Sequence, residues 1–461
     1  MSIIEQKDSY IYTIGYIKMV CHFKICPVLL RSQKHILMKP VALLLFMLSF
    51  YYSIAQNSKD FISGDAEVNG FSNERLGRID KTIREYIDSN WIKGAVAFIA
   101  HDGVIVYDKA FGINDESKKT TLKTDDIFRI ASQTKAITSV ATMMLFEEGK
   151  YLLDDPVSKY IPAFKHPQVL DKFNEKDSTY TTVPAKREIT VRDLLTHTSG
   201  IDYAQIGSDK MKAIYAKAGV EAGFMASKHL LATDIDKLGK LPLVCQPGEK
   251  FTYSMSIDVL GRLVEVASGM SLDAFFHKRI FEPLGMNDTY FHLPESKQSR
   301  LVSVYTEDKK THAPVLWQDG TFPGATVNYP INNNGYYAGG AGLVSTIKDY
   351  AIFLQMMVNG GEYNGHRLLS RHTVDIMTKN QIGDIFFGDN KFGLGFGITT
   401  EKGNLKLGES VGNFWWGGFF GTSYWGDPKE KVVALLFIQQ WPFSHGELSD
   451  KYKVLVYQAL K

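Results

Sequence analysis

The stretch "FRIASQTKAI", residues 128–137, places Ser132 and Lys135 three positions apart at the beginning of an apolar helical pattern. Apolar residues follow one stripe at helical spacing until Gly149, a typical helix end. The pattern predicts a buried helix over 132–148. Because residues at i and i+3 share one helical face, the Ser132 hydroxyl and the Lys135 amine are expected to lie side by side.

The chemistry of this pair depends on burial. Burial of a lysine lowers the pKa of its ammonium, and a neutral amine beside a hydroxyl acts as its general base. The helix N-terminus also favours negative charge that develops near Ser132. The sequence therefore predicts a nucleophile at Ser132 that is activated by an unprotonated Lys135. A helix cap with a solvated lysine is the alternative interpretation of the same residues.

The same spacing occurs a second time in "STIK", at Ser345 and Lys348. Here Thr346 and Asp349 fit a capping box ahead of the apolar run "YAIFLQMM". A helix start explains this copy by itself, so the second motif is interpreted as structural.

Two later segments contain further candidate residues for the same site, a tyrosine and a pair of glycines. Tyr253 stands at a turn before an amphipathic pattern over 256–268, and a neighbouring cation helps a tyrosine hydroxyl to release its proton. The paired glycines of "WWGGFFG" suggest a strand that a ligand or another backbone approaches closely, and such a strand can direct an N–H into a cleft. A core tyrosine and a bulge in an aromatic edge strand are the alternatives.

Together these segments resemble the serine β-lactamase and penicillin-binding protein superfamily. The residues of these motifs are most similar to its class C-like branch, which includes carboxylesterases with a W-G-G motif. The resemblance extends over roughly residues 75–445 and rests on "IFRIASQTKAITSVATMMLFEEGKYLLDDPVSKYIP", "ITVRDLLTHTSGI", "PGEKFTYSMSIDVLGRLVEVASG", "GGAGLVSTIKDYAIF" and "WGGFFGTSYWGDP".

The resemblance implies a role for each matching residue. Ser132 is expected to be the acylated nucleophile, with Lys135 and Tyr253 relaying its proton. The backbone N–H groups of Ser132 and Phe419 are expected to form the oxyanion hole. His197 of "LLTHTSG" matches a family signature with an architectural role. No metal and no organic cofactor are implied.

Departures from the β-lactamase pattern indicate the substrate. The chain has Met255 where β-lactamases have the Asn of Tyr-x-Asn, and Trp416-Gly417-Gly418 where they have K-T-G. These four residues are the predicted substrate contacts. An indole offers one neutral donor and cannot pair with a carboxylate as a cation does. Hydrolysis of a carboxylic ester is therefore expected. A β-lactamase, DD-peptidase or D-aminopeptidase, an acyltransferase, and a binding protein without turnover remain alternatives.

The predicted fold is α+β. Two β-rich runs near the chain ends, a hairpin over 94–112 and strands over 413–441, are expected to form one antiparallel sheet around an inserted, mainly helical region at roughly 150–340. The predicted domain spans 75–461, with a long loop over 298–342. Helices are expected at 74–90, 132–148, 190–196, 209–218, 256–268, 272–280, 346–358 and 447–460.

The N-terminal segment, 1–55, has a different character. Met38 begins a positively charged start, a short apolar run and a small-residue end, which predicts a secretory signal peptide over 38–55 and export to the periplasm or medium. Residues 1–37 are expected to precede the true start. Only an uncleaved signal would anchor the protein to a membrane. Cys245 is then the single mature cysteine, and its apolar approach predicts a buried thiol.

Composition restricts the partners. A formal net charge of +2 without a long basic run provides no electrostatic footprint for nucleic acid. The twelve histidines form no H-E-x-x-H motif, so the sequence predicts no metal site. A small-molecule ester or acyl compound is the expected partner, and the sequence does not determine the oligomeric state.

Overall fold

The computed structural model describes residues 60–224, 229–318, 320–322, 324–332 and 335–461, which all belong to one unit, Asn57–Lys461. The predicted signal peptide over 38–55 and the residues before it lie outside this described part. Within the described ranges, no helix combines the length and the apolar character needed to cross a membrane.

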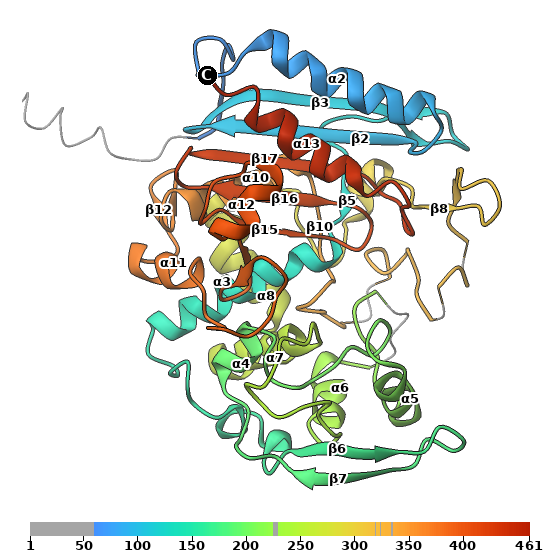
Figure 1. The fold of residues 1–461 in the computed structure, drawn as a ribbon, viewed down its shortest axis with the longest axis vertical. Coiled ribbons are helices and arrows are strands. Elements are labelled where there is room, and N and C mark those ends of the chain that lie inside the picture. The colour runs from blue at the N-terminus through green and yellow to red at the C-terminus, as the bar shows by residue number, and fades with distance from the viewer. Residues whose placement is uncertain (1–59, 225–228, 319, 323, 333–334) are drawn as a thin grey trace, which may run out of the picture. The chain divides into compact units, whose positions relative to one another are not determined.

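A nine-stranded sheet joins the two ends of the described chain (Figure 1). Its central contact is the antiparallel pairing of β2 (Gly94–His101) with β17 (Val432–Phe437), in which Val96 lies opposite Phe437. This confirms the predicted α+β fold. The short β1 (Ile62–Ser63) pairs in parallel with β3, so the sheet is mixed rather than purely antiparallel. The strand order is β1-β3-β2-β17-β16-β15-β14-β13, with β4 (Thr120–Thr121) paired to β3. The bounds of the strands not yet given are β3 Val104–Asp115, β16 Ser423–Asp427, β15 Phe414–Gly417, β14 Gly397–Ile398 and β13 Lys391–Phe392.

The hairpin predicted from Asp102-Gly103 is present. β2 and β3 (Val104–Asp115) meet at these two residues, whose φ angles are 48° and 79°. Two consecutive positive φ angles define the turn type that matches strand twist, and Asp-Gly is a sequence that adopts it with little strain.

Alternating side chains of β2 enter two different cores. Ala97 packs on the face covered by α2 (Asn73–Asp88) and α13 (Glu447–Tyr457), which lie side by side in Figure 1. Val96 faces the larger core that contains α3 (Thr134–Glu147) and α10 (Ile347–Val358). Both faces are buried, which explains why the strand is apolar throughout rather than alternating.

The inserted region is mainly helical, as predicted, and α7 packs directly against α3. It also contains strands that the sequence did not predict: a hairpin of β6 and β7, and β8 and β9 within the predicted loop over 298–342. The bounds are β6 Gln168–Phe173, β7 Tyr180–Pro184, α4 Val191–Leu195, α5 Asp209–Ala218, α6 Leu231–Leu238, α7 Ser256–Ser268, α8 Leu272–Phe276, α9 Glu282–Leu284, β8 Tyr305–Glu307 and β9 Pro314–Leu316. A π-helical turn, His277–Phe281, links α8 to α9.

The aromatic segment near the C-terminus departs from its prediction. One aromatic strand was expected, but a tight turn divides it into β15 (Phe414–Gly417) and β16 (Ser423–Asp427). In this turn the Gly418 N–H donates to the Thr422 carbonyl at 2.7 Å and the Gly421 N–H to the Gly418 carbonyl at 3.0 Å. The turn carries Phe419, the predicted oxyanion donor.

The remaining elements are short. They are β5 (Phe128–Arg129), β10 (Val344–Ser345), β11 (Glu362–Tyr363), β12 (His366–Arg367), α11 (Arg371–Met377), β13 (Lys391–Phe392), β14 (Gly397–Ile398) and α12 (Glu401–Leu407).

Candidate active site

Ser132 lies in a tight turn immediately before α3. It belongs to a single 3-10 turn, Ala131–Gln133, that connects β5 to the helix, and its side chain is half-buried. Ala131 has a φ of 43°, a left-handed conformation that costs free energy for a residue with a side chain. The chain therefore uses a strained turn to place the hydroxyl at the helix start.

Three predicted catalytic residues come together at this hydroxyl. The Tyr253 hydroxyl donates to Ser132 Oγ at 2.7 Å, and Lys135 Nζ donates to the same oxygen at 3.3 Å. The Lys135 nitrogen also lies 4.7 Å from the centre of the Tyr253 ring. Lys135 is only 2% exposed, so the burial expected of it is present.

The groups around Lys135 bear on its protonation state. Burial by itself lowers the pKa of this ammonium. However, two tyrosine hydroxyls and the Asp258 carboxylate face the amine, and together they raise its pKa above the ordinary value. The hydrogen bonds agree, because the three N–H groups of an ammonium find three acceptors: Ser132 Oγ, the Tyr203 hydroxyl at 3.4 Å and the Gly340 carbonyl at 2.7 Å. These contacts favour the ammonium form, and the neutral amine expected from burial stays a prediction.

Asp258 is a further residue of the candidate site, and no sequence motif indicated it. Its side chain is fully buried in α7, and its Oδ1 accepts the Gly340 N–H at 3.1 Å, while Gly340 accepts from Lys135 on its other side. Burial raises the pKa of the Asp258 carboxyl, and the Lys135 charge lowers it in part. A side chain at position 340 would bring its Cβ within 2.6 Å of Asp258 Oδ2, so this close approach requires glycine.

Tyr203 was also missed, although it follows the "LLTHTSG" signature by only three residues. Its ring stacks on Tyr253 with centroids 5.7 Å apart, and it contributes one of the hydroxyls near Lys135. His197 of the signature packs against Tyr253 at 4.9 Å, and its Nδ1 is 3.1 Å from Ser254 Oγ. Burial keeps the pKa of His197 well below its usual value, so the imidazole is neutral and supports the tyrosine.

The W-G-G segment lies beside the same group. The Trp416 ring is 5.5 Å from Tyr253, and a Cβ at Gly418 would approach the Ile130 carbonyl to 2.4 Å. The Gly418 backbone therefore lies directly against the segment that leads to Ser132. Within the described ranges, the N–H groups of Ser132 and Phe419 donate no hydrogen bond to the protein, so both remain available to an oxyanion.

The other predicted contacts fall into two groups. Trp416, Gly417 and Gly418 are half-buried and reach the surface. Met255 is 0% exposed and packs in the main core, so it presents no surface to a substrate in this structure. Met255 is the N-cap residue of α7, and its side chain packs in the same core as the buried apolar residues of that helix. Cys245 is buried, as expected, and burial raises the pKa of its thiol.

The second Ser-x-x-Lys motif is a helix start. Thr346 Oγ1 accepts the Asp349 N–H at 3.1 Å, which is half of the predicted capping box. The Asp349 carboxylate does not return to Thr346; it accepts from the Asp288 N–H at 2.7 Å and from Thr289 at 3.0 Å. Ser345 Oγ lies 2.8 Å from Thr289 Oγ1, and Lys348 is exposed.

Comparison with known proteins identifies the family of the chain. The family model described as Beta-lactamase matches residues 79–459. Protein Rv1367c of Mycobacterium tuberculosis is 32% identical over 374 residues, covering 78% of this chain and 89% of that protein. Esterase EstB of Burkholderia gladioli is 28% identical with the same coverage.

Solved structures show the same fold. EstCE1, described as a hydrolase with promiscuous acyltransferase activity, superposes with a TM-score of 0.73 at 24% identity and covers 83% of this chain and 99% of its own. The match between family model, relatives and fold confirms the resemblance to the β-lactamase and penicillin-binding protein superfamily. The chain therefore belongs to the beta-lactamase family of serine hydrolases.

Proposed function

We propose that the protein hydrolyses uncharged carboxylic esters through an acyl-enzyme on Ser132. The observation that carries the proposal is the contact of Ser132 Oγ with the Tyr253 hydroxyl at 2.7 Å, beside a buried Lys135 nitrogen at 3.3 Å. A hydroxyl with an adjacent proton acceptor and a fixed cation is the arrangement that activates a nucleophile.

In the acylation step, Ser132 Oγ attacks the ester carbonyl and forms a C–O bond. Tyr253 first releases its own proton to solvent, and the Lys135 ammonium beside it stabilises the resulting phenolate, which takes the Oγ proton. The N–H groups of Ser132 and Phe419 hold the oxyanion. The bond between the carbonyl carbon and the alkoxy oxygen then breaks, and Tyr253 returns the proton to the departing alcohol.

In the deacylation step, water attacks the acyl carbonyl, gives a proton to Tyr253 and releases the free acid. The Ser132 oxygen recovers the proton from Tyr253. A second alcohol that enters in place of water would receive the acyl group, so transfer is a side reaction of the same residues. EstCE1, which shares the fold, is described as a hydrolase with promiscuous acyltransferase activity.

The surroundings of Ser132 support an uncharged substrate. On one side, Phe419 stacks on Trp441 at 4.4 Å and contacts Phe224 at 4.9 Å. On the other side, Phe387 stacks on Trp416 at 6.2 Å. These rings favour apolar acyl and alcohol groups, whereas Trp416 gives a substrate carboxylate no cationic partner. The esterase name of EstB, at 28% identity, supports the same substrate class.

The test compares neutral esters with a charged lactam. We expect the protein to hydrolyse short p-nitrophenyl esters and to hydrolyse a chromogenic cephalosporin far more slowly. Trp416→Lys should lower the ratio of ester to cephalosporin hydrolysis at least tenfold, because it introduces a cation. The neutral control Trp416→Phe should not lower this ratio. Faster turnover of the cephalosporin by the wild type would contradict the proposal.

A fluorophosphonate probe tests the enzyme against a non-catalytic binding protein. Wild-type protein should be labelled, and Ser132→Ala should not. If wild-type protein remains unlabelled while it still binds esters, the fold serves binding rather than turnover.

We also propose that the enzyme is exported after cleavage near Ala55. The support is the charge and apolar pattern over 38–55. Sequencing the N-terminus of the mature protein tests this, and retention of residues before Met38 would contradict it.

A further inference from the structure

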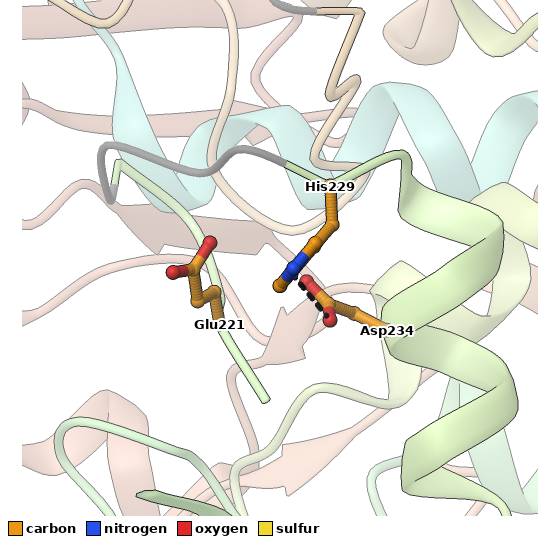
Figure 2. A group of neighbouring side chains, drawn as sticks. All are labelled: Glu221, His229 and Asp234. Atoms are coloured by element: carbon orange, nitrogen blue, oxygen red, sulfur yellow. Dashed lines mark ion pairs between the residues drawn. The ribbon is translucent and has the colours of Figure 1, made fainter. Parts of the chain in front are cut away.

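A polar cluster outside the active site contains ligands suited to a transition metal. Glu221 follows α5, His229 precedes α6, and Asp234 lies in the first turn of α6 (Figure 2). Each offers one ligand atom, and the three atoms lie within 4.8 Å of one another. Figure 2 shows the His229 ring and the Asp234 carboxylate pointing toward each other from separate segments.

The cluster contains buried oxygens that lack a partner. Asp234 is 0% exposed, and its Oδ2 accepts no hydrogen bond within the described residues. The same holds for Glu221 Oε2, which is also buried. A buried carboxylate oxygen without a donor costs free energy, and a bound cation is one of the few groups that can satisfy two of them together.

One cation is already present, but it does not balance the cluster. Lys237 Nζ lies 3.1 Å from Asp234 Oδ1 and 3.5 Å from His229 Nδ1, and it donates to the Gly219 carbonyl at 2.8 Å. Two carboxylates and one ammonium leave one negative charge when the imidazole is neutral. Lys237 is 32% exposed, so its flexible side chain can turn out to solvent and leave the Asp234 oxygen to another cation.

We propose that Glu221, His229 and Asp234 form a binding site for a divalent transition metal, represented by Zn²⁺. One imidazole nitrogen and two carboxylate oxygens are ligands that Zn²⁺ accepts, with water in the fourth position, whereas Ca²⁺ requires oxygen ligands. The backbone of α6 around Asp234 supplies no ligand, so the three side chains alone define the site.

The site connects two segments near the catalytic lysine. The Tyr336 hydroxyl donates to the Glu221 carbonyl at 3.1 Å. Tyr336 precedes Gly340, which accepts from Lys135, by four residues. A metal that ties Glu221 to α6 would therefore hold the segment behind the active site, which gives the site a structural role.

The experiment is a titration of chelator-treated, full-length protein with Zn²⁺ by calorimetry, with a parallel thermal melt. We expect one saturable site, a raised melting temperature, and no comparable effect of Ca²⁺. His229→Ala should weaken Zn²⁺ binding at least tenfold. The matched control is His277→Ala, because His277 also pairs with a carboxylate, Glu282, at 3.1 Å, but lies outside the cluster.

Lys237 provides an independent test with the opposite sign. If the ammonium competes with the metal, Lys237→Met should strengthen Zn²⁺ binding several-fold. Glu221→Gln keeps the size of the side chain and should weaken binding, so it replaces His229→Ala if that variant does not fold. No Zn²⁺ uptake by the wild type, or equal affinity in Glu221→Gln and wild type, would overturn the proposal.

Discussion

The two Ser-x-x-Lys motifs differ in what surrounds them, not in their spacing. They even lie side by side, because β5, which leads to Ser132, pairs with β10, which contains Ser345. At the first motif the lysine is 2% exposed and its nitrogen contacts the serine hydroxyl. At the second the lysine is exposed and the serine bonds Thr289 instead.

This difference shows that the spacing alone carries no chemistry. The first serine faces Tyr253, from the segment before α7, and the turn after β15. The second bonds Thr289 and its own helix cap, and neither supplies a base or a cation. Substitutions at matched positions of the two motifs therefore test which surroundings give the serine its reactivity.

The largest expected effect is at the two serines. Ser132→Ala should reduce ester hydrolysis by about 10³-fold or more, because the acyl group loses its attachment. Ser345→Ala should keep activity within about twofold and lower the free energy of unfolding by about 1 kcal/mol, through loss of one buried hydrogen bond. Steady-state kinetics and denaturant unfolding measure the two. A large loss of activity in Ser345→Ala, without unfolding, would contradict the structural role of Ser345.

The two lysines should differ almost as strongly. Lys135→Met keeps the length of the side chain but removes the charge beside Tyr253, and we expect kcat to fall by roughly 10²- to 10⁴-fold. Lys348→Met should be indistinguishable from wild type in kcat, since its side chain lies in solvent. Equal kinetics for Lys135→Met and wild type would show that the buried cation is not needed.

The two glycines of the W-G-G segment test how the oxyanion donor is positioned at the first motif. A Cβ at Gly418 would lie 2.2 Å from Thr422 Oγ1 and 2.4 Å from the Ile130 carbonyl, whereas one at Gly417 meets nothing closer than 3.1 Å. Gly418→Ala should displace the Phe419 N–H and reduce kcat by about 10²-fold. Gly417→Ala should cost less than about tenfold. The reverse order would show that the turn does not position the oxyanion donor.

The smallest effect concerns the cap of the second motif. Burial raises the pKa of Asp349 to about 6, above that of an unfolded aspartate. The folded state therefore binds this proton more tightly, and the stability from this group is complete below about pH 4 and lost as the pH rises through the folded pKa. Between pH 4 and 7, the free energy of unfolding of the wild type should fall by on the order of 2 kcal/mol more than that of Asp349→Asn. Thermal melts at each pH measure this difference. Parallel pH profiles would contradict this assignment.

Local patterns predicted most of the fold. Apolar periodicity located α2, α3, α7, α10 and α13, and Asp102-Gly103 predicted the first hairpin. The division of the aromatic segment into β15 and β16 was not predictable in the same way. Aromatic residues continue through both strands, and the turn at Gly418 becomes evident only from its backbone hydrogen bonds, such as the one from the Gly418 N–H to the Thr422 carbonyl.

The site was predictable where a motif marks it and not where long-range contacts create it. Ser132, Lys135 and Tyr253 stand in recognisable segments. Asp258 contacts the site through a hydrogen bond from the Gly340 N–H, 82 positions away, and no local sequence pattern predicts that hydrogen bond. The surroundings of Lys135 follow the same rule, since its burial and the nearby Tyr253 were predictable, whereas Asp258 and Tyr203 were not.

The conformation of Ala131 has a consequence for protein engineering. Its φ of 43° is one that glycine adopts freely and that β-branched residues resist. Mutational libraries should tolerate glycine there and reject valine or isoleucine, even though the site is apolar and buried. A backbone held out of its relaxed state next to the nucleophile also means that variants selected only for heat resistance will tend to lose turnover at this position.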